Sequence, residues 1–170
     1  MSADTESRPY PPLTPYLTVS DAAAAIAFYV KAFGAEEIER ALTPDGQKVM
    51  HAEVAVNGGL IMLSDDFSES PQQGSTPEAL GGSPVTIHLS VEDAEALWER
   101  AVAAGAEVTM PLERQFWGAL YGRLRDPFGH HWSVISEMAP VSDEELREGA
   151  SEAFPEHAEE QDNETPPADP

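Results

Sequence analysis

The sequence predicts an α+β fold built from two tandem βαβββ modules. Two observations support this prediction: an internal repeat of about 70 residues, and the same order of one strand, one helix and three strands in both copies. The chain of 170 residues is long enough to bury a hydrophobic core, as one domain or as two small repeated halves.

The internal repeat is visible as matching segments at a nearly constant spacing. Residues 16–21 match residues 88–93 at an offset of 72, and residues 34–36 match residues 105–107 at an offset of 71. A single one-residue shift over this distance is unexpected by chance. A unit of this length exceeds a solenoid repeat, so we expect two copies of one small module.

Each half begins with a strand that leads into a capped helix. Apolar and polar residues alternate at 16–19 and again at 88–91, which indicates half-buried strands. An acidic N-cap, Asp21 or Asp93, follows each strand, and a glycine then ends each helix. The predicted buried stripes are Ile26, Tyr29, Val30 and Phe33 in the first helix and Leu97, Ala101 and Ala104 in the second.

Three further strands follow each helix, separated by turn residues. The expected strands are 36–42, 48–56 and 60–64 in the first half, and 107–110, 119–125 and 131–136 in the second. The turns before the last strands are Asn57-Gly58-Gly59 and Asp126-Pro127-Phe128-Gly129.

The ends of the chain and one central stretch are poor in residues that a core could bury. We expect disorder in both ends because such segments cannot offset their ordering entropy by burial. Ser142, followed by Glu145, could open one or two helical turns. The predicted organisation is a disordered N-terminus (1–12), a folded domain (13–137) with module one (13–67), a linker (68–83) and module two (84–137), and a largely disordered acidic tail (138–170).

The net charge of −22 restricts the classes of partner. Twelve of the 31 acidic residues, but one of the nine basic residues, lie between residues 137 and 170. This acidity argues against binding to nucleic acid or to anionic membranes. The chain has no cysteine, no apolar run long enough to span a bilayer and no signal-peptide core near its start, so we expect a soluble cytoplasmic protein.

Several motifs resemble one known superfamily. They are Thr14-Pro15-Tyr16-Leu17, Ala32-Phe33-Gly34-Ala35-Glu36, Val49-Met50-His51-Ala52-Glu53, Gln115-Phe116-Trp117-Gly118 and Asp126-Pro127-Phe128-Gly129-His130. With the duplicated βαβββ unit, these motifs resemble the vicinal oxygen chelate superfamily, and within it the PhnB-like branch of the glyoxalase/bleomycin-resistance proteins. The resemblance implies that both modules form a curved mixed sheet around a cavity, with the helices outside. It also implies a homodimer, with cavities that two chains can share.

The same resemblance places the superfamily's metal ligands at Thr14, Met62, Thr86 and Ser133. Hydroxyls and a thioether are poor ligands for the hard cations of these enzymes. We therefore expect no metal or other cofactor, which argues against glyoxalase I or extradiol dioxygenase activity. A divalent metal at a displaced site made of His51, Glu53 and His88 is the alternative.

The densest unusual segment, residues 115–123, combines aromatic and basic side chains. An apolar pocket with a few polar groups suits a small organic molecule. The alternative is that Phe116 and Trp117 are core or dimer contacts and that Arg123 neutralises a carboxylate. The predicted ligand-binding residues are Tyr16, Met62, His88, Trp117, Tyr121, Arg123, His131 and Ser133.

His51 and Glu53 are the candidate catalytic residues, since either side chain could remove a proton from a carbon acid. The 71-residue offset, however, aligns Met50 and Ala52 with Tyr121 and Arg123. His51 and Glu53 in the first half can therefore face the cavity together with Tyr121 and Arg123 in the second only if a bulge or indel shifts one strand by one residue.

The predicted function is the binding or sequestration of an organic ligand. The alternative is a lyase or isomerase that acts on a small carbonyl or carbon-acid substrate, and a third possibility is an interaction module that presents the acidic tail. The sequence has no motif for nucleophilic catalysis or for binding a dinucleotide. Arg114, Arg123 and Arg125 cluster beside the predicted cavity, which favours an anionic ligand.

Overall fold

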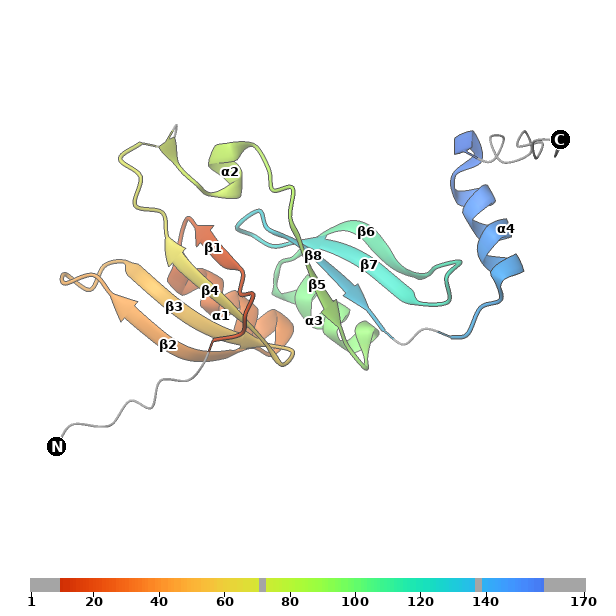
Figure 1. Ribbon diagram of the computed structural model, residues 1–170. Coiled ribbons are helices and arrows are strands. Elements are labelled where there is room, and N and C mark those ends of the chain that lie inside the picture. The colour runs from red at the N-terminus through yellow and green to blue at the C-terminus, as the bar shows by residue number, and fades with distance from the viewer. Residues whose placement is uncertain (1–9, 71–72, 137–138, 158–170) are drawn as a thin grey trace, which may run out of the picture.

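The computed structural model describes residues 10–70, 73–136 and 139–157. The two modules lie side by side (Figure 1), and each contains one strand, one helix and three more strands in that order. The α+β class with tandem βαβββ modules is therefore confirmed.

Module one forms a four-stranded mixed sheet with one helix. Its elements are β1 (Tyr16–Val19), α1 (Ala22–Phe33), β2 (Glu36–Leu42), β3 (Val49–Val56) and β4 (Gly59–Asp65). The Asp21 side chain accepts a hydrogen bond from the Ala24 amide at 2.9 Å and caps α1. The strand order is β1-β4-β3-β2, with β1 parallel to β4 and the other neighbours antiparallel.

Module two repeats this plan. Its elements are β5 (Thr86–Ser90), α3 (Ala94–Ala104), β6 (Glu107–Arg114), β7 (Leu120–Arg125) and β8 (His131–Ile135). Asp93 caps α3 as Asp21 caps α1, and the strand order β5-β8-β7-β6 matches that of module one. Within one chain the two sheets stay separate and do not close around a cavity.

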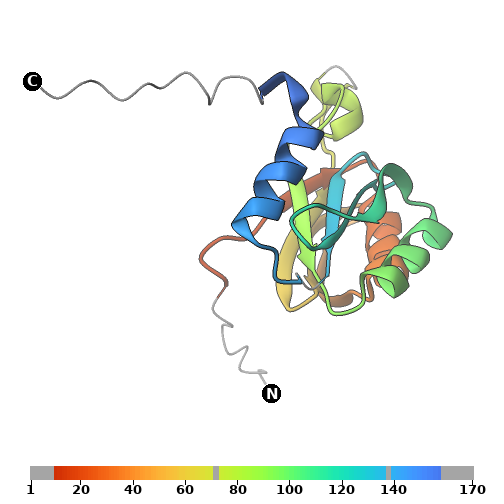
Figure 2. The same ribbon diagram turned by 90° about the vertical axis from the view of Figure 1, so that its right-hand side faces the viewer.

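Helices α1 and α3 cover the same side of the two sheets and pack against each other (Figure 2). The strand residues that face them are fully buried, including Val54, Leu63, Leu124 and Trp132. Because side chains alternate across a strand, the other face of each sheet carries a separate set of residues. That second face is the part of the fold that forms the candidate site.

Asp126, in the β7–β8 turn, ties the two modules together. Its Oδ1 accepts hydrogen bonds from the Phe128 and His130 amides, as expected for a residue that caps its turn. Its Oδ2 accepts hydrogen bonds from Trp132 Nε1 and from the hydroxyl of Tyr29 on α1, both at 2.9 Å. Tyr29 is 0% exposed, and burial together with the nearby Asp126 carboxylate raises its pKa well above the usual value.

Two elements lie outside the repeated modules. Within the predicted linker, the short helix α2 (Pro77–Leu80) places the buried Pro77 against the turn at Gly129. After module two come α4 (Asp143–Ala153) and the short 3-10 helix η2 (Pro155–His157). Helix α4 begins at the predicted cap, where Ser142 and Glu145 form a capping box, but it is longer than the expected one or two turns.

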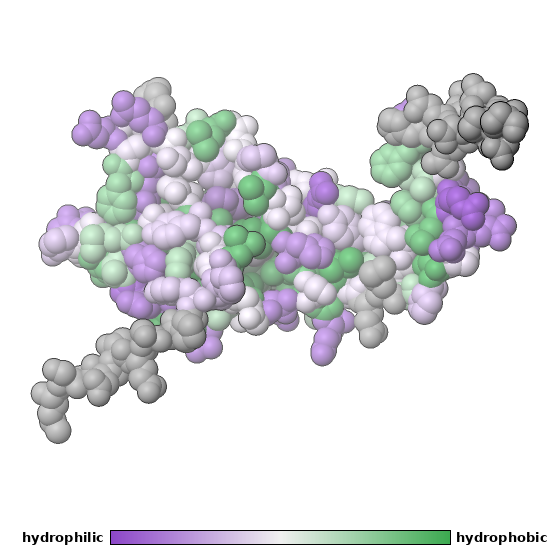
Figure 3. Space-filling view, viewed as in Figure 1, coloured by the Kyte–Doolittle hydropathy of each residue, from purple (hydrophilic) through white to green (hydrophobic). Residues whose placement is uncertain are grey.

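Helix α4 lies on the side of the sheets opposite α1 and α3 (Figure 2). Figure 3 shows apolar side chains along one side of α4 and hydrophilic ones along the other. A Cβ placed on Gly149 would lie 2.4 Å from Phe116 Cβ, so α4 touches the turn between β6 and β7 very closely. This contact places α4 beside the segment that carries Trp117.

Two local predictions are wrong. Strand β6 continues to Arg114 instead of ending before Pro111, because β6 is an edge strand and a proline there costs no ladder hydrogen bond. Val30 is 44% exposed, whereas Phe28 is 8% exposed. The buried surface of α1 extends toward module two, where Phe28 meets the ring of Phe128.

Candidate functional site

The open faces of the two sheets carry the predicted site residues in equivalent rows. On sheet one, Met62 lies opposite both Tyr16 and Glu53. On sheet two, Ser133 lies opposite both His88 and Arg123. Tyr16 and His88 are exposed, in contrast to the buried residues on the helix side.

The strand pairing shows how His51 and Glu53 can lie on an open face when Tyr121 and Arg123 do so as well. Since Glu53 pairs with Met62 as Arg123 pairs with Ser133, Glu53 is the structural equivalent of Arg123. His51 is then the equivalent of Tyr121, at an offset of 70 rather than 71. A one-residue shift between the modules thus places all four side chains on the open faces, as a bulge or indel was expected to do.

The open face of sheet two holds a connected group of polar and aromatic side chains. Ser133 Oγ lies 2.8 Å from His88 Nδ1, and Ser133 itself is 2% exposed. Arg123 Nε donates a hydrogen bond of 2.8 Å to the Tyr121 hydroxyl. The Tyr121 ring lies 6.4 Å from that of His88 and 5.8 Å from that of Trp117, so the aromatic group extends into the β6–β7 turn.

A hollow of about 540 Å³ lies on this face. Its lining comprises Ser83, Pro84, Thr86, Thr109, Met110, Arg123 and His131. The sequence indicated Arg123 and His131, but not the segment 83–84 or the pair Thr109 and Met110. Those residues reach the hollow through the end of the linker and through an edge strand, and no motif marks them.

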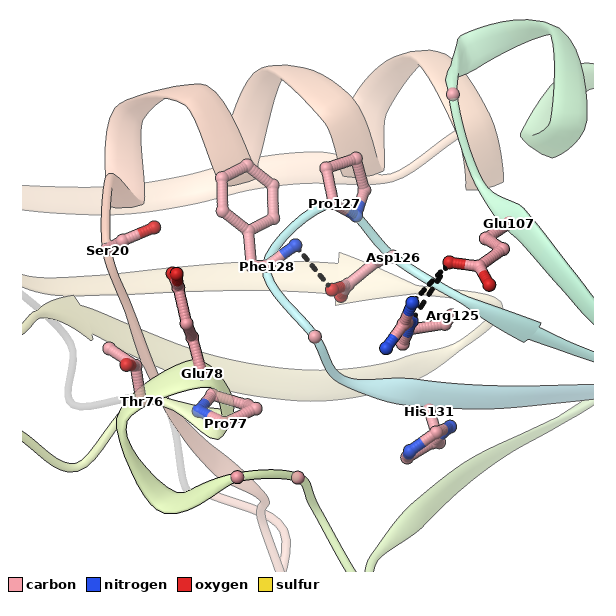
Figure 4. Close-up of a pocket in the computed structure, with 14 residues that line it drawn as sticks. Ser20, Thr76, Pro77, Glu78, Glu107, Arg125, Asp126, Pro127, Phe128 and His131 are labelled. Carbon is pink, nitrogen blue, oxygen red and sulfur yellow. Dashed lines mark hydrogen bonds and ion pairs between the residues drawn. The ribbon is translucent and has the colours of Figure 1, made fainter.

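A second hollow of about 450 Å³ lies between α2 and the β7–β8 turn (Figure 4). Glu78 and Ser20 border it on one side, and the ion pair of Arg125 with Glu107 borders it on the other. His131 lines both hollows. The second hollow has an already neutralised arginine, so it offers less to a charged ligand than the open face.

The open face of sheet one carries a chain of hydrogen-bonding groups. The Tyr16 hydroxyl lies 3.2 Å from His51 Nδ1, and His51 Nε2 lies 3.5 Å from Glu53 Oε1. The Tyr10 hydroxyl donates to the same Glu53 oxygen at 2.6 Å. Glu53 is 4% exposed, so its carboxylate is held in a partly dry environment.

The predicted site residues therefore fall into two groups within one chain. Tyr16, His51, Glu53 and Met62 lie on sheet one, while His88, Trp117, Tyr121, Arg123, His131 and Ser133 belong to module two. The two sheets do not join, so within one chain these residues form two separate groups.

The residues at the superfamily's metal positions do not suit a hard cation. Thr14 Oγ1 donates to the Pro11 carbonyl oxygen, and Ser133 Oγ is engaged by His88. Met62 offers a thioether, which prefers soft metals. Within residues 10–70, 73–136 and 139–157, no three His, Asp or Glu side chains are grouped to hold a metal ion, and His88 is not placed with His51 and Glu53.

The model of one protein family matches most of this chain. The Glyoxalase/Bleomycin resistance protein/Dioxygenase superfamily matches residues 13–134. The chain therefore belongs to this superfamily, in agreement with the tandem modules and with the resemblance seen in the sequence. In the described part of the chain, no helix is both long and apolar enough to cross a membrane.

The chain is also similar to known proteins and solved structures. The uncharacterized protein Mb0911c of Mycobacterium bovis is 49% identical over 142 residues, which are 83% of this chain and 93% of the relative. The X-ray structure of the Arabidopsis thaliana protein At5g48480 has a TM-score of 0.57 at 30% identity, over 74% of this chain and 98% of that one. A PhnB protein from Bacillus cereus, named as a putative 3-demethylubiquinone-9 3-methyltransferase, has a TM-score of 0.59 at 20% identity, over 75% and 100% of the two chains.

Proposed function

We propose that this protein binds a small organic molecule on the open faces of its sheets, and that it sequesters or senses that molecule. The observation that carries the proposal is the contrast between the two faces of sheet two. The helix side is packed with Leu124, Trp132 and Val134, all 0% exposed, whereas the open side carries the aromatic group of His88, Tyr121 and Trp117 and, at Arg123, a hollow lined mainly by polar residues. Aromatic surface with a few oriented polar groups is typical of small-molecule sites.

The proposed binding unit is a homodimer. Each chain has two open faces of equivalent shape, and a two-fold axis lets module one of each copy cover module two of the other. Size-exclusion chromatography of the full chain, coupled to light scattering, should give a mass of about twice 18.3 kDa. A monomer at micromolar concentration would contradict this part of the proposal.

A thermal-shift screen across metabolites and antibiotics tests ligand binding directly. A ligand that binds the folded state raises the melting temperature by mass action. Trp117→Ala should abolish the rise while leaving the unliganded melting temperature nearly unchanged, since Trp117 is a half-buried turn residue. Phe67→Ala is the control, because Phe67 is an exposed aromatic outside both open faces. Equal stabilisation of wild type and Trp117→Ala would remove this role from the site.

The second candidate function is a lyase or isomerase that acts on a carbonyl compound. The observation that favours it is the His51–Glu53 pair, with Tyr16 on the other side of the imidazole. A carboxylate beside a histidine orients the ring and stabilises the imidazolium that forms when the ring takes a proton. His51 would remove a proton from the carbon next to a carbonyl, leaving an enolate, and would return the proton to a carbon of that enolate.

Solvent-exchange NMR in D₂O separates the two candidate functions. An isomerase replaces the acidic C–H of its substrate with deuterium, and His51→Gln should suppress this exchange by about 100-fold or more. A pure binder exchanges nothing above the uncatalysed rate. Metal analysis of protein purified without chelator covers the displaced-site alternative, for which about one ion per chain is expected.

We further propose a cytoplasmic location and no nucleic-acid or membrane partner. The excess of 31 acidic over nine basic residues argues against these anionic partners, and the lack of cysteine fits a reducing compartment.

A further inference from the structure

We infer that the ligand of the open face of sheet two carries an oxyanion, a carboxylate or a phosphate, bound by the guanidinium of Arg123. This inference rests on the proposed function and names the chemical class of the ligand. It follows from three properties of Arg123: its missing carboxylate partner, its fixed orientation and its surroundings.

The first property is that Arg123 is not neutralised. Among the described residues, the other strand arginines all have partners: Arg40 pairs with Glu37, Arg125 pairs with Glu107, and Arg114 donates to the Gly118 carbonyl oxygen. Arg123 has no carboxylate within salt-bridge distance in this part of the chain, although the protein has 31 acidic side chains. In so acidic a protein, an exposed arginine without a carboxylate is available to an external anion.

The second property is that the guanidinium is oriented. Its Nε donates to the Tyr121 hydroxyl at 2.8 Å, and its central carbon lies 5.9 Å from the centre of the same ring. These contacts use one edge of the guanidinium and leave the two terminal nitrogens to bind a ligand. A planar fork of two N–H donors matches the two oxygens of a carboxylate or phosphate.

The third property is the surroundings of the fork. Arg123 and His131 line the same hollow, together with the exposed Thr86. The Tyr121 ring, which Arg123 contacts, lies 5.8 Å from the ring of Trp117, so aromatic surface that can stack on a flat organic group adjoins the guanidinium without lining the hollow. The site therefore fits an anionic head attached to an aromatic or other planar body.

Three probes that share a phenyl ring test this inference: benzoate, the isosteric but neutral benzamide, and phenyl phosphate. Binding to the full-length protein is measured by ligand-observed NMR and by intrinsic tryptophan fluorescence, with Trp117→Ala showing which part of the signal comes from Trp117. We expect benzoate or phenyl phosphate to bind at least about 10-fold more tightly than benzamide. The more tightly bound of the two anions identifies the kind of oxyanion.

Variants assign the anion to Arg123. Arg123→Gln should weaken anion binding about 10-fold or more, and Arg123→Lys should recover part of the loss, because lysine keeps the charge but not the fork. Arg100→Gln is the matched control, since it removes the same charge from the exposed side of α3. Unchanged melting temperatures of the unliganded variants show that each variant is folded.

Each outcome has a defined meaning. If benzamide binds as tightly as benzoate and Trp117→Ala weakens both, the proposed function stands and the oxyanion inference is overturned. If Arg100→Gln weakens anion binding as much as Arg123→Gln, net charge rather than Arg123 attracts the anion, and the inference is again overturned. If none of the probes binds, the oxyanion inference fails, and the metabolite screen then decides on the proposed function alone.

Discussion

The hydrogen bond between Tyr29 and Asp126 makes the stability of this fold depend on pH in a way that one substitution removes. The bond joins α1 of module one to the β7–β8 turn of module two, with an O–O distance of 2.9 Å between two buried groups. Tyr29→Phe deletes the donor and keeps the ring. Because a hydrogen bond to a carboxylate contributes about 1.5–3 kcal/mol, we expect a loss of about 2 kcal/mol in the free energy of unfolding at pH 8.

The pKa of Tyr29 determines how this difference changes with pH. Burial and Asp126 raise that pKa in the folded state, whereas the unfolded chain loses the phenol proton near pH 10. The stabilisation is thus complete below about pH 10 and declines as pH rises above it. At pH 11 the gap between wild type and Tyr29→Phe should be smaller by about 1.4 kcal/mol than at pH 8.

Urea unfolding of the wild type and of Tyr29→Phe gives the difference in their free energies of unfolding at pH 8 and at pH 11. Tyr16→Phe is the control, because Tyr16 is 51% exposed and its hydroxyl bond should contribute little to stability. A Tyr29→Phe effect below about 0.5 kcal/mol at pH 8, or a gap that does not change with pH, would refute the role of this bond.

Three other predictions concern local packing. Gly122→Ala should cost about 1–3 kcal/mol in chemical unfolding, since its Cβ would lie 2.7 Å from the Trp98 ring and 2.9 Å from Leu112 Cα; an equal loss for the unhindered Gly59→Ala would contradict this explanation. Gly149→Leu should release α4 from Phe116, because a larger side chain cannot fit between them. Hydrogen exchange in residues 143–153 should then become faster while the melting temperature stays the same. Unaltered exchange would show that this contact does not hold α4 in place. Ser142→Ala should remove the N-cap of α4 and lower the local stability of this helix, measured by hydrogen exchange, by about 1 kcal/mol. Hydrogen exchange as slow as in the wild type would mean that the cap contributes nothing.

The sequence was sufficient to predict the repeated modules because each boundary has a local chemical cause. Asp21 and Asp93 cap their helices through their own side chains, and Gly34 and Gly105 adopt the left-handed conformation that ends them. These signals act within a few residues and need no knowledge of distant contacts. The same holds for Ser142, whose capping box was visible although the length of α4 was not.

Features that depend on distant contacts could not be read from the sequence. The buried surface of α1 extends toward Phe128 because module two packs on it. The spacing of apolar residues within α1 carries no information about this distant contact. The tie from Tyr29 to Asp126 spans 97 residues and was missed for the same reason.

The sequence indicated which residues lie on the open faces, but not how these residues are placed relative to one another. Residues such as His51 and Arg123 do lie on open faces, but strand pairing, rather than spacing in the sequence, fixes the offset of 70 that aligns Glu53 with Arg123. The separation of the residues into two groups, one on each sheet, also required the strand order of both sheets.

Hydrogen–deuterium exchange with and without the strongest stabiliser from the metabolite screen tests the central claim most directly. If the open face of sheet two binds the ligand, protection should appear in β5, β7, β8 and the turn that carries Trp117, and Arg123→Gln should reduce it. Protection confined to α2 and the β7–β8 turn, around the hollow of Figure 4, would contradict the account, because the ligand would then occupy a different site.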